Sequence, residues 1–216
     1  MVSNLSLQNS LVSEWLSELR QVGTQNDRQR FRKNLERLGE VAAYEISQRL
    51  PYIHELISTP MGEIEVARLE AQPVVATILR AGIPMHQGLL NYFDKADAAF
   101  VAGFRKHYRD GSFEIEQQYI TSPELTYRDL VIADPMLASG ASLELAIRTL
   151  CSLGEPRSIY IVSAIACTVG IDHIKRTIPE AHIVTGAIDD ELTARGYIVP
   201  GLGDAGDLSY GPKMQA

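Results

Sequence analysis

The stretch from residue 134 to residue 142 combines one carboxylate with small and hydroxyl-bearing residues, a composition suited to a phosphorylated ligand. Its residues are Asp134, Pro135, Met136, Leu137, Ala138, Ser139, Gly140, Ala141 and Ser142. Small residues let an anion approach the backbone N–H groups, and the two serines add hydroxyl donors. The Asp134 carboxylate repels phosphate, so it suits a neighbouring hydroxyl-bearing group such as a ribose, or a metal ion. The alternative is an ordinary strand-to-helix turn with Ser142 as the N-cap.

The flanking residues place this stretch between a strand and a helix. Apolar residues 130–133 precede it as a short run typical of a buried strand, and apolar residues at helical spacing follow from 143 to 150. In open α/β sheets ligands bind at the carboxyl ends of the strands. The N-terminus of the following helix adds free N–H donors and the positive end of its dipole. The sequence therefore predicts an anion site at this edge of a sheet.

Two further stretches carry groups that complement such a ligand. Arg80 and Gly82 follow a predicted strand at 74–79. A guanidinium fork fits two adjacent phosphate oxygens, and glycine lets the backbone turn close to the ligand. Residues 196–207 hold four glycines and a proline among apolar residues, which is typical of an ordered loop with special backbone angles. The N–H and C=O groups of such a loop can face a flat ligand.

All three stretches resemble one enzyme family. Residues 134–142 are similar to the phosphoribosyl-diphosphate (PRPP) loop of type I phosphoribosyltransferases, and within that family they are close to the uracil phosphoribosyltransferase form. That form has threonine in place of Ser139 and glycine in place of Ala141. The first difference keeps the hydroxyl, whereas the second adds a methyl where such a loop can need a positive φ. Residues 78–82 are similar to the family's diphosphate-binding loop, and residues 196–207 look nearly identical to its uracil-binding loop.

The resemblance implies roles for the matching residues. It implies that PRPP is bound by all nine residues of 134–142 together with Arg80, Arg105 and Asp204. It implies that uracil is bound by Tyr197, Ile198, Gly203, Asp204 and Ala205. The implied catalytic groups are Arg80, Arg105 and Asp204, and the implied cofactor is Mg²⁺ held mainly through the diphosphate, with no protein metal site.

The implied reaction is that of uracil and PRPP to UMP and diphosphate, a step of pyrimidine salvage. Backbone N–H, C=O and N–H groups in order match the O2, N3–H and O4 edge of uracil, whereas cytosine would leave buried polar groups unpaired. Two rival functions remain: the same fold acting on orotate or a purine, and a PRPP- or nucleotide-sensing regulator that binds RNA. A generic nucleotide-binding module explains the 134–142 stretch alone.

The order of the apolar patterns predicts an α/β fold with a parallel sheet and helices on both faces, of the type I phosphoribosyltransferase kind. Predicted strands lie at 74–79, 98–104, 115–120, 130–133, 158–166 and 183–188. We expect a single domain over residues 1–216, with a helical lead-in at 1–50 and a β-hairpin arm or hood at 51–70. The resemblance implies a homodimer or larger homo-oligomer, and a GTP effector is known in some members.

Bulk composition agrees with a globular enzyme. The 216 residues are 45% hydrophobic and 22% charged, and the net charge of −7 disfavours nucleic-acid binding. The sequence shows no apolar run long enough to span a bilayer and no signal-peptide pattern, so we expect no membrane partner. Cys151 and Cys167 lie in apolar surroundings and are expected to be buried free thiols, which fits the reducing cytoplasm.

Other charged residues are expected to have structural roles. The basic cluster on the second helix is predicted to be a solvated face, with a subunit contact as the alternative; its members are Arg28, Arg30, Arg32 and Lys33. The acidic residues 189–191 are predicted to cap or solvate the turn after the last strand. Residues 105–113 are predicted to form a polar loop.

Overall fold

The computed structural model describes residues 1–107 and 113–213, with side chains described for 1–103 and 119–213. Within this part of the chain, the main sheet has eight strands in the order β1-β10-β9-β7-β4-β5-β6, and β8 pairs with β9. Its strands are β1 (Val2–Asn4), β4 (Val74–Leu79), β5 (Asp97–His107), β6 (Phe113–Thr121), β7 (Asp129–Ala133), β8 (Met136–Leu137), β9 (Ser158–Cys167) and β10 (His182–Asp189). The pairings are parallel except that of β5 with β6.

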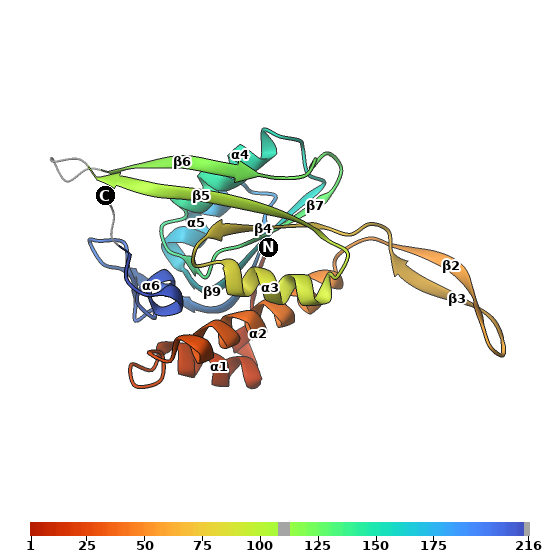
Figure 1. The fold of residues 1–216 in the computed structure, drawn as a ribbon, viewed down its shortest axis with the longest axis horizontal. Helices are drawn as coiled ribbons and strands as arrows, with labels where there is room; N and C mark the ends of the chain where they lie inside the picture. Colours follow the sequence, from red (N-terminus) through yellow and green to blue (C-terminus); the bar gives the residue numbers. More distant parts are fainter. Residues whose placement is uncertain (108–112, 214–216) are drawn as a thin grey trace.

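Helices cover both faces of this sheet (Figure 1). On one face lie α1 (Leu11–Arg20), α2 (Arg28–Ser47) and α3 (Ile83–Tyr92), and on the other lie α4 (Ala141–Cys151) and α5 (Thr168–Thr177). Successive strand residues point to opposite faces, so Val75 joins the core under α1–α3 and Val74 the core under α4 and α5. This explains the continuous apolar runs, and the predicted α/β class is confirmed.

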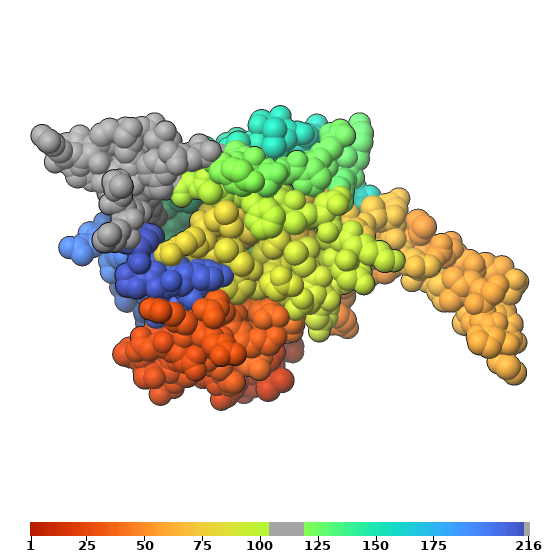
Figure 2. Space-filling view, viewed as in Figure 1, coloured from red at the N-terminus to blue at the C-terminus, as the bar shows by residue number. Residues whose placement is uncertain are grey.

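The predicted hairpin arm is present. β2 (Tyr52–Thr59) and β3 (Gly62–Leu69) pair antiparallel in a separate two-stranded sheet that projects from the body (Figures 1 and 2). Its apolar side chains are largely exposed: Leu56 is 64% exposed, Ile64 53% and Met61 97%. A lone two-stranded hairpin is only marginally stable in water, so this arm has apolar surface left to bury.

Two predictions of local structure are wrong in detail. The lead-in is not wholly helical, because Val2–Asn4 forms the edge strand β1 beside β10, and a strand of this length carries no readable periodicity. The polar loop is shorter than predicted, because β5 reaches His107 and β6 begins at Phe113, paired across the sheet. The rest of that predicted loop, 108–112, lies outside the described residues. No helix in the described ranges has the length and apolar character needed to cross a membrane.

A helix cap, a close backbone approach and an ion pair fix the helices on the first face. α2 begins after Asp27, whose carboxylate accepts from the N–H groups of Gln29 and Arg30 at 3.0 Å each. A Cβ at Gly39 of α2 would overlap the carbonyl oxygen of Met85 in α3, so only glycine allows this approach. α1 and α2 are joined by Glu18 and Arg30, whose Nε and Nη2 lie 2.7 Å from the two carboxylate oxygens.

The Glu18 carboxylate predicts how the stability of the folded protein changes at acid pH. The hydrogen bonds from Arg30, and then that from Asn34, lower the pKa of Glu18 from 4.5 to about 2. A carboxylate whose pKa is lowered by folding stabilises the folded state above its unfolded pKa, and that contribution disappears as the pH falls towards the folded pKa. Glu18→Gln should therefore unfold at lower urea concentration than the wild type near pH 7, with a gap that narrows between about pH 4.5 and 2. A gap that stays constant over this range would contradict the assignment.

Candidate active site

Two of the three predicted stretches leave the sheet at the same edge. β4 and β7 are parallel neighbours, with Thr77 opposite Ala133, so the residues after each strand emerge side by side. The Thr77 hydroxyl donates to the Ala133 carbonyl at 3.2 Å. Gly82 folds back onto this pair, since a Cβ there would overlap the Thr77 side chain and lie 2.7 Å from the Ala133 carbonyl oxygen. The turn after β4 is thereby held beside Asp134.

The 134–142 stretch is held by β9 before it enters α4. The Asp134 N–H donates to the Val162 carbonyl at 3.0 Å, and β8 then pairs with β9. The N-cap of α4 is Gly140, with φ of 85°, so the alternative of Ser142 as the N-cap is wrong. The positive φ falls on this glycine, while Ala141 already has helical backbone angles. The methyl of Ala141 therefore meets no backbone strain.

This loop presents unused donors at the N-terminus of α4. The N–H groups of Ser139, Gly140 and Ser142 have no acceptor within the described part of the chain, while the Ala138 N–H donates to the Met136 carbonyl. Both serines are half-buried. Free N–H groups, hydroxyls and a helix N-terminus are together donors of the kind that can bind a phosphate.

α5 packs against the back of this loop. A Cβ at Gly170 would overlap the carbonyl oxygen of Ala138. His173 lies against Gly140, and its Nε2 is 2.6 Å from the Glu144 carboxylate. Arg148, and to a lesser degree His173, lowers the pKa of Glu144. The donors of the loop are thus fixed from behind by a second helix.

The third stretch forms a closed hairpin, a loop and a short helix. β11 (Glu191–Leu192) pairs with β12 (Ile198–Val199), and α6 (Ala205–Tyr210) follows the loop. Asp204 is the N-cap of α6, and its Oδ1 accepts from the N–H groups of Gly206 and Asp207 at 2.9 and 3.0 Å. No hydrogen bond engages the backbone of Leu202 or Gly203 in the described ranges. These free N–H and C=O groups are the feature that the sequence predicted for a flat ligand.

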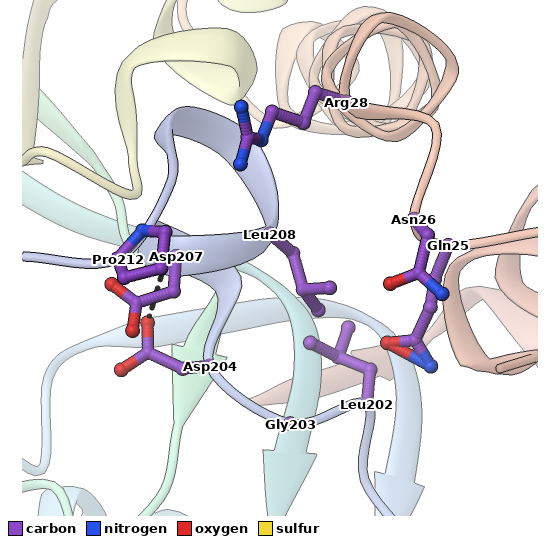
Figure 3. Close-up of a pocket in the computed structure, with 9 residues that line it drawn as sticks. All are labelled: Gln25, Asn26, Arg28, Leu202, Gly203, Asp204, Asp207, Leu208 and Pro212. Atoms are coloured by element: carbon purple, nitrogen blue, oxygen red, sulfur yellow. Dashed lines mark hydrogen bonds between the residues drawn. The ribbon is translucent and has the colours of Figure 1, made fainter.

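The residues named for this stretch occupy different environments. Tyr197 is 46% exposed in the hairpin turn, whereas Ile198 is 4% exposed and belongs to the core under α1–α3. Gly203 and Asp204 border a cavity of about 370 Å³ between the loop and the start of α2. Asp204 and Asp207 lie on one side of this cavity and Gln25 and Asn26 on the other (Figure 3). Arg28, Leu202, Leu208 and Pro212 complete the lining.

Arg80 joins the strand ends to the third stretch. Its Nη2 donates to the Gly211 carbonyl at 3.2 Å and to the Asp207 carboxylate at 3.3 Å, across the fold from β4 to α6. The guanidinium-bearing side chain is 40% exposed, so it remains accessible to a ligand. The peptide bond before it, Leu79–Arg80, is cis. Arg105 lies in β5, which ends at the same sheet edge, but its side chain is outside the described residues.

Sequence reasoning missed the arginines that hold the third stretch. Asp189 was expected to cap or solvate a turn, but it is 8% exposed and forms a two-pronged ion pair with Arg20 of α1. Arg32 is not on a solvated face, because its Nη1 donates to the Ser209 carbonyl at 2.7 Å and its guanidinium lies 5.8 Å from the ring centre of Tyr210. These contacts span most of the chain, so no local pattern signals them.

Comparison with known proteins agrees with this arrangement. A family model described as uracil phosphoribosyltransferase matches residues 6–212. The chain belongs to the uracil phosphoribosyltransferase family. The uracil phosphoribosyltransferase of Porphyromonas gingivalis is 47% identical over 214 residues, covering 99% of each chain. That of Pyrococcus furiosus is 38% identical over 207 residues, covering 94% of this chain and 88% of the relative.

Solved structures show the same fold. The AQ2163 protein from Aquifex aeolicus superposes with a TM-score of 0.85 at 31% identity, covering 98% of each chain. A hypoxanthine phosphoribosyltransferase from Staphylococcus aureus shares the fold with a TM-score of 0.50 at 15% identity, covering 86% of this chain and 84% of that one. This uracil phosphoribosyltransferase family member is thus a phosphoribosyltransferase enzyme of the type I fold, as the resemblance implied.

Proposed function

We propose that the enzyme transfers the phosphoribosyl group of PRPP to uracil, giving UMP and diphosphate, as a step of pyrimidine salvage. The observation that carries this proposal is the contact of Arg80 with Asp207 and Gly211. It brings a cation suited to diphosphate next to the loop with the free backbone groups of Gly203. The two relatives named above are called uracil phosphoribosyltransferases. Their similarity to this chain extends over most of their length, which supports the choice of base.

In this proposal the 134–142 loop holds the ribose phosphate. The N–H groups of Ser139, Gly140 and Ser142 bind the 5′-phosphate at the N-terminus of α4. Asp134, half-buried at the end of β7, accepts hydrogen bonds from the ribose hydroxyls. The remaining residues of the loop, Pro135, Met136, Leu137, Ala138 and Ala141, shape the PRPP site.

The third stretch receives uracil. Free backbone groups at Gly203, with the N–H of Ala205 beyond it, pair with the polar edge of the base, and Tyr197 and Ile198 shape the loop around it. A site whose buried polar groups are matched to uracil should have a kcat/KM for cytosine lower than that for uracil by a factor of roughly 10²–10⁵.

The chemistry is a substitution at C1′ of the ribose. Uracil N1 bonds to C1′ while the bond from C1′ to the diphosphate oxygen breaks, through a transition state with oxocarbenium character, and the N1 proton passes to the departing diphosphate or to water. Arg80 and Arg105 stabilise the negative charge that builds on diphosphate. Oδ1 of Asp204 is engaged in capping α6, whereas Oδ2 makes only an exposed ion pair of 3.7 Å with Lys213 Nζ, so Oδ2 is the oxygen that can turn to N1 or the cationic ribose. Fixed geometry and electrostatics supply most of the rate.

The donors present fit a magnesium ion that arrives with the substrate. Mg²⁺ prefers oxygen ligands and is commonly held by one or two carboxylates plus substrate phosphates. The diphosphate would supply most of the ligands, and Asp207 beside Arg80 could add a carboxylate oxygen; the described residues contain no group of three or more His, Cys, Asp or Glu suited to a metal. When bound, the ion would neutralise diphosphate charge.

We also propose that the 216 residues act as one domain within a homodimer or larger assembly. The exposed apolar side chains of the β2–β3 arm support this, because a second subunit would bury them. Both cysteines are free thiols, which fits the cytoplasm, although only Cys167 is buried as expected and Cys151 is half-buried. The proposal that GTP is an effector rests on the family resemblance, and the assay in the next paragraph tests it.

A diphosphate-release assay tests the function. Purified enzyme would receive PRPP and Mg²⁺ with uracil, cytosine, orotate, hypoxanthine or adenine, each with and without GTP. We expect turnover with uracil only, and a rate increase with GTP if it is an effector. Turnover with another base would overturn the assignment of the base loop, and PRPP binding without turnover would favour the regulator.

Gly170 offers a test of the PRPP loop from its back side. Gly170→Ala should raise the KM for PRPP, because the new methyl displaces Ala138, and overpacking of this kind costs about 1–3 kcal/mol of stability. Gly39→Ala is the matched control, since its methyl overlaps a backbone carbonyl oxygen in the same way at the α2–α3 contact. Equal changes in the KM for PRPP in the two variants would show that only general destabilisation was at work.

A further inference from the structure

Asp189 is a buried carboxylate to which the proposed reaction gives no role, and it anchors the start of the base loop. It ends β10 and is 8% exposed. Its Oδ2 accepts from the Gly201 N–H at 3.0 Å. Arg20 of α1 neutralises it, with Nη1 2.7 Å from Oδ2 and Nη2 2.8 Å from Oδ1. The free-energy cost of burying this charge is offset by the two charge-assisted hydrogen bonds from Arg20.

Arg20 also holds the other backbone polar group of the same residue, Gly201. Its Nη1 donates to the Gly201 carbonyl at 2.9 Å. The N–H and the C=O of Gly201 are therefore both fixed, one by a side chain from β10 and the other by a side chain from α1. Gly201 has φ of 54°, and a Cβ there would overlap the Ile198 carbonyl, so the backbone is sharply turned at this point.

The free backbone groups of the base loop lie between this anchor and a second one. Gly201 is followed by Leu202 and Gly203, whose backbone groups have no partner in the described ranges. Asp204 then fixes the chain by capping α6. Because only two residues separate the anchors, the position of Gly201 sets the direction in which the N–H and C=O of Gly203 point.

We propose that Arg20 and Asp189 are positioning residues for base recognition: by clamping Gly201 they set the affinity for the base and the selectivity for uracil over cytosine. This inference rests on the proposed function of the loop. It gives the N-terminal helix α1 a role in specificity, although Arg20 and Asp189 lie 169 residues apart in the sequence. A misplacement of about 1 Å in such a loop can cost about 10²-fold in rate.

The test is a set of variants with a matched control. Arg20→Gln removes the charge and the fork, Asp189→Asn keeps an acceptor for the Gly201 N–H, and Arg20→Lys keeps only the charge. Arg30→Gln is the control, because Arg30 forms a similar two-pronged pair with Glu18 of the same helix α1 but is not among the residues that contact Gly201. Steady-state rates with uracil, cytosine and PRPP give a separate KM for each substrate.

We expect Arg20→Gln to raise the KM for uracil by about 10- to 100-fold and to lower the preference for uracil over cytosine, with a KM for PRPP within about twofold of the wild type. Arg20→Lys should recover part of the uracil KM, and Arg30→Gln should leave both KM values unchanged. If Arg20→Gln raised the KM values for uracil and PRPP equally, or if Arg30→Gln changed them as Arg20→Gln does, the proposal would be overturned. Such a result would indicate a general loosening of α1.

Hydrogen exchange of the free enzyme separates this inference from the proposed function. Arg20→Gln should speed amide exchange in peptides covering 198–208 but not in those covering 74–79, and Arg30→Gln should change neither. If the wild type fails to use uracil, the proposed function fails, and the exchange data still decide whether Arg20 orders this loop. Unchanged exchange at 198–208 in Arg20→Gln would overturn the clamp.

Discussion

Arg80→Ala is expected to lower turnover by about 10²–10³-fold while changing the free energy of unfolding by no more than about 1 kcal/mol. The side chain is 40% exposed, and its contacts are the Gly211 carbonyl at 3.2 Å and the Asp207 carboxylate at 3.3 Å. Such solvent-exposed contacts contribute little to stability. The same guanidinium faces the developing charge of diphosphate in the proposed transition state, where a fixed cation has its largest effect.

Arg128→Ala is the control for this variant. Arg128 is 27% exposed and its Nη1 lies 2.6 Å from the Asp97 carboxylate, at the opposite edge of the sheet where β5 and β7 begin. Its loss should affect stability at least as much as that of Arg80, with turnover unchanged. Single-turnover rates and urea denaturation of both variants make the comparison. A folded Arg80→Ala enzyme with wild-type turnover would remove Arg80 from the mechanism.

Asp204 is expected to show separate structural and chemical roles. Asp204→Asn keeps an oxygen that can accept from the N–H groups of Gly206 and Asp207, so the cap of α6 and the stability should be retained. Asp204→Ala removes this cap, so its free energy of unfolding should be about 1 kcal/mol lower than that of the wild type, which is typical for a lost N-cap. Both variants lack the carboxylate charge that we propose to lie near N1 and the ribose, so both should lose turnover by about 10²-fold.

The N-cap of α1 provides the matched control for Asp204. Ser10 accepts from the Val12 N–H at 3.2 Å, and Ser10→Ala should lose comparable stability without loss of turnover. Thermal unfolding and kcat would be measured for all three variants. If Asp204→Asn kept full turnover and only Asp204→Ala lost it, the residue would be a cap and no more.

The functional stretches were readable from the sequence because each is contiguous. The Arg80 turn, the 134–142 loop and the 196–207 loop each carry their own glycines and charged residues, and the first two directly follow an apolar run that predicts a strand. Parallel pairing places the ends of neighbouring strands at one edge, so the convergence of the first two stretches could be inferred before any coordinates.

What the sequence by itself determined is therefore the α/β class, the main strands and the local chemistry of three loops. Only the tertiary structure decided how these loops are held. The contacts of Arg20 with Asp189 and Gly201, and of Arg32 with Ser209, join residues 169 to 181 positions apart. Hydrogen bonds of this kind depend on where the helices pack, and packing is set by the whole core. Local periodicity reports which face of an element is buried, but it carries no record of the distant partner.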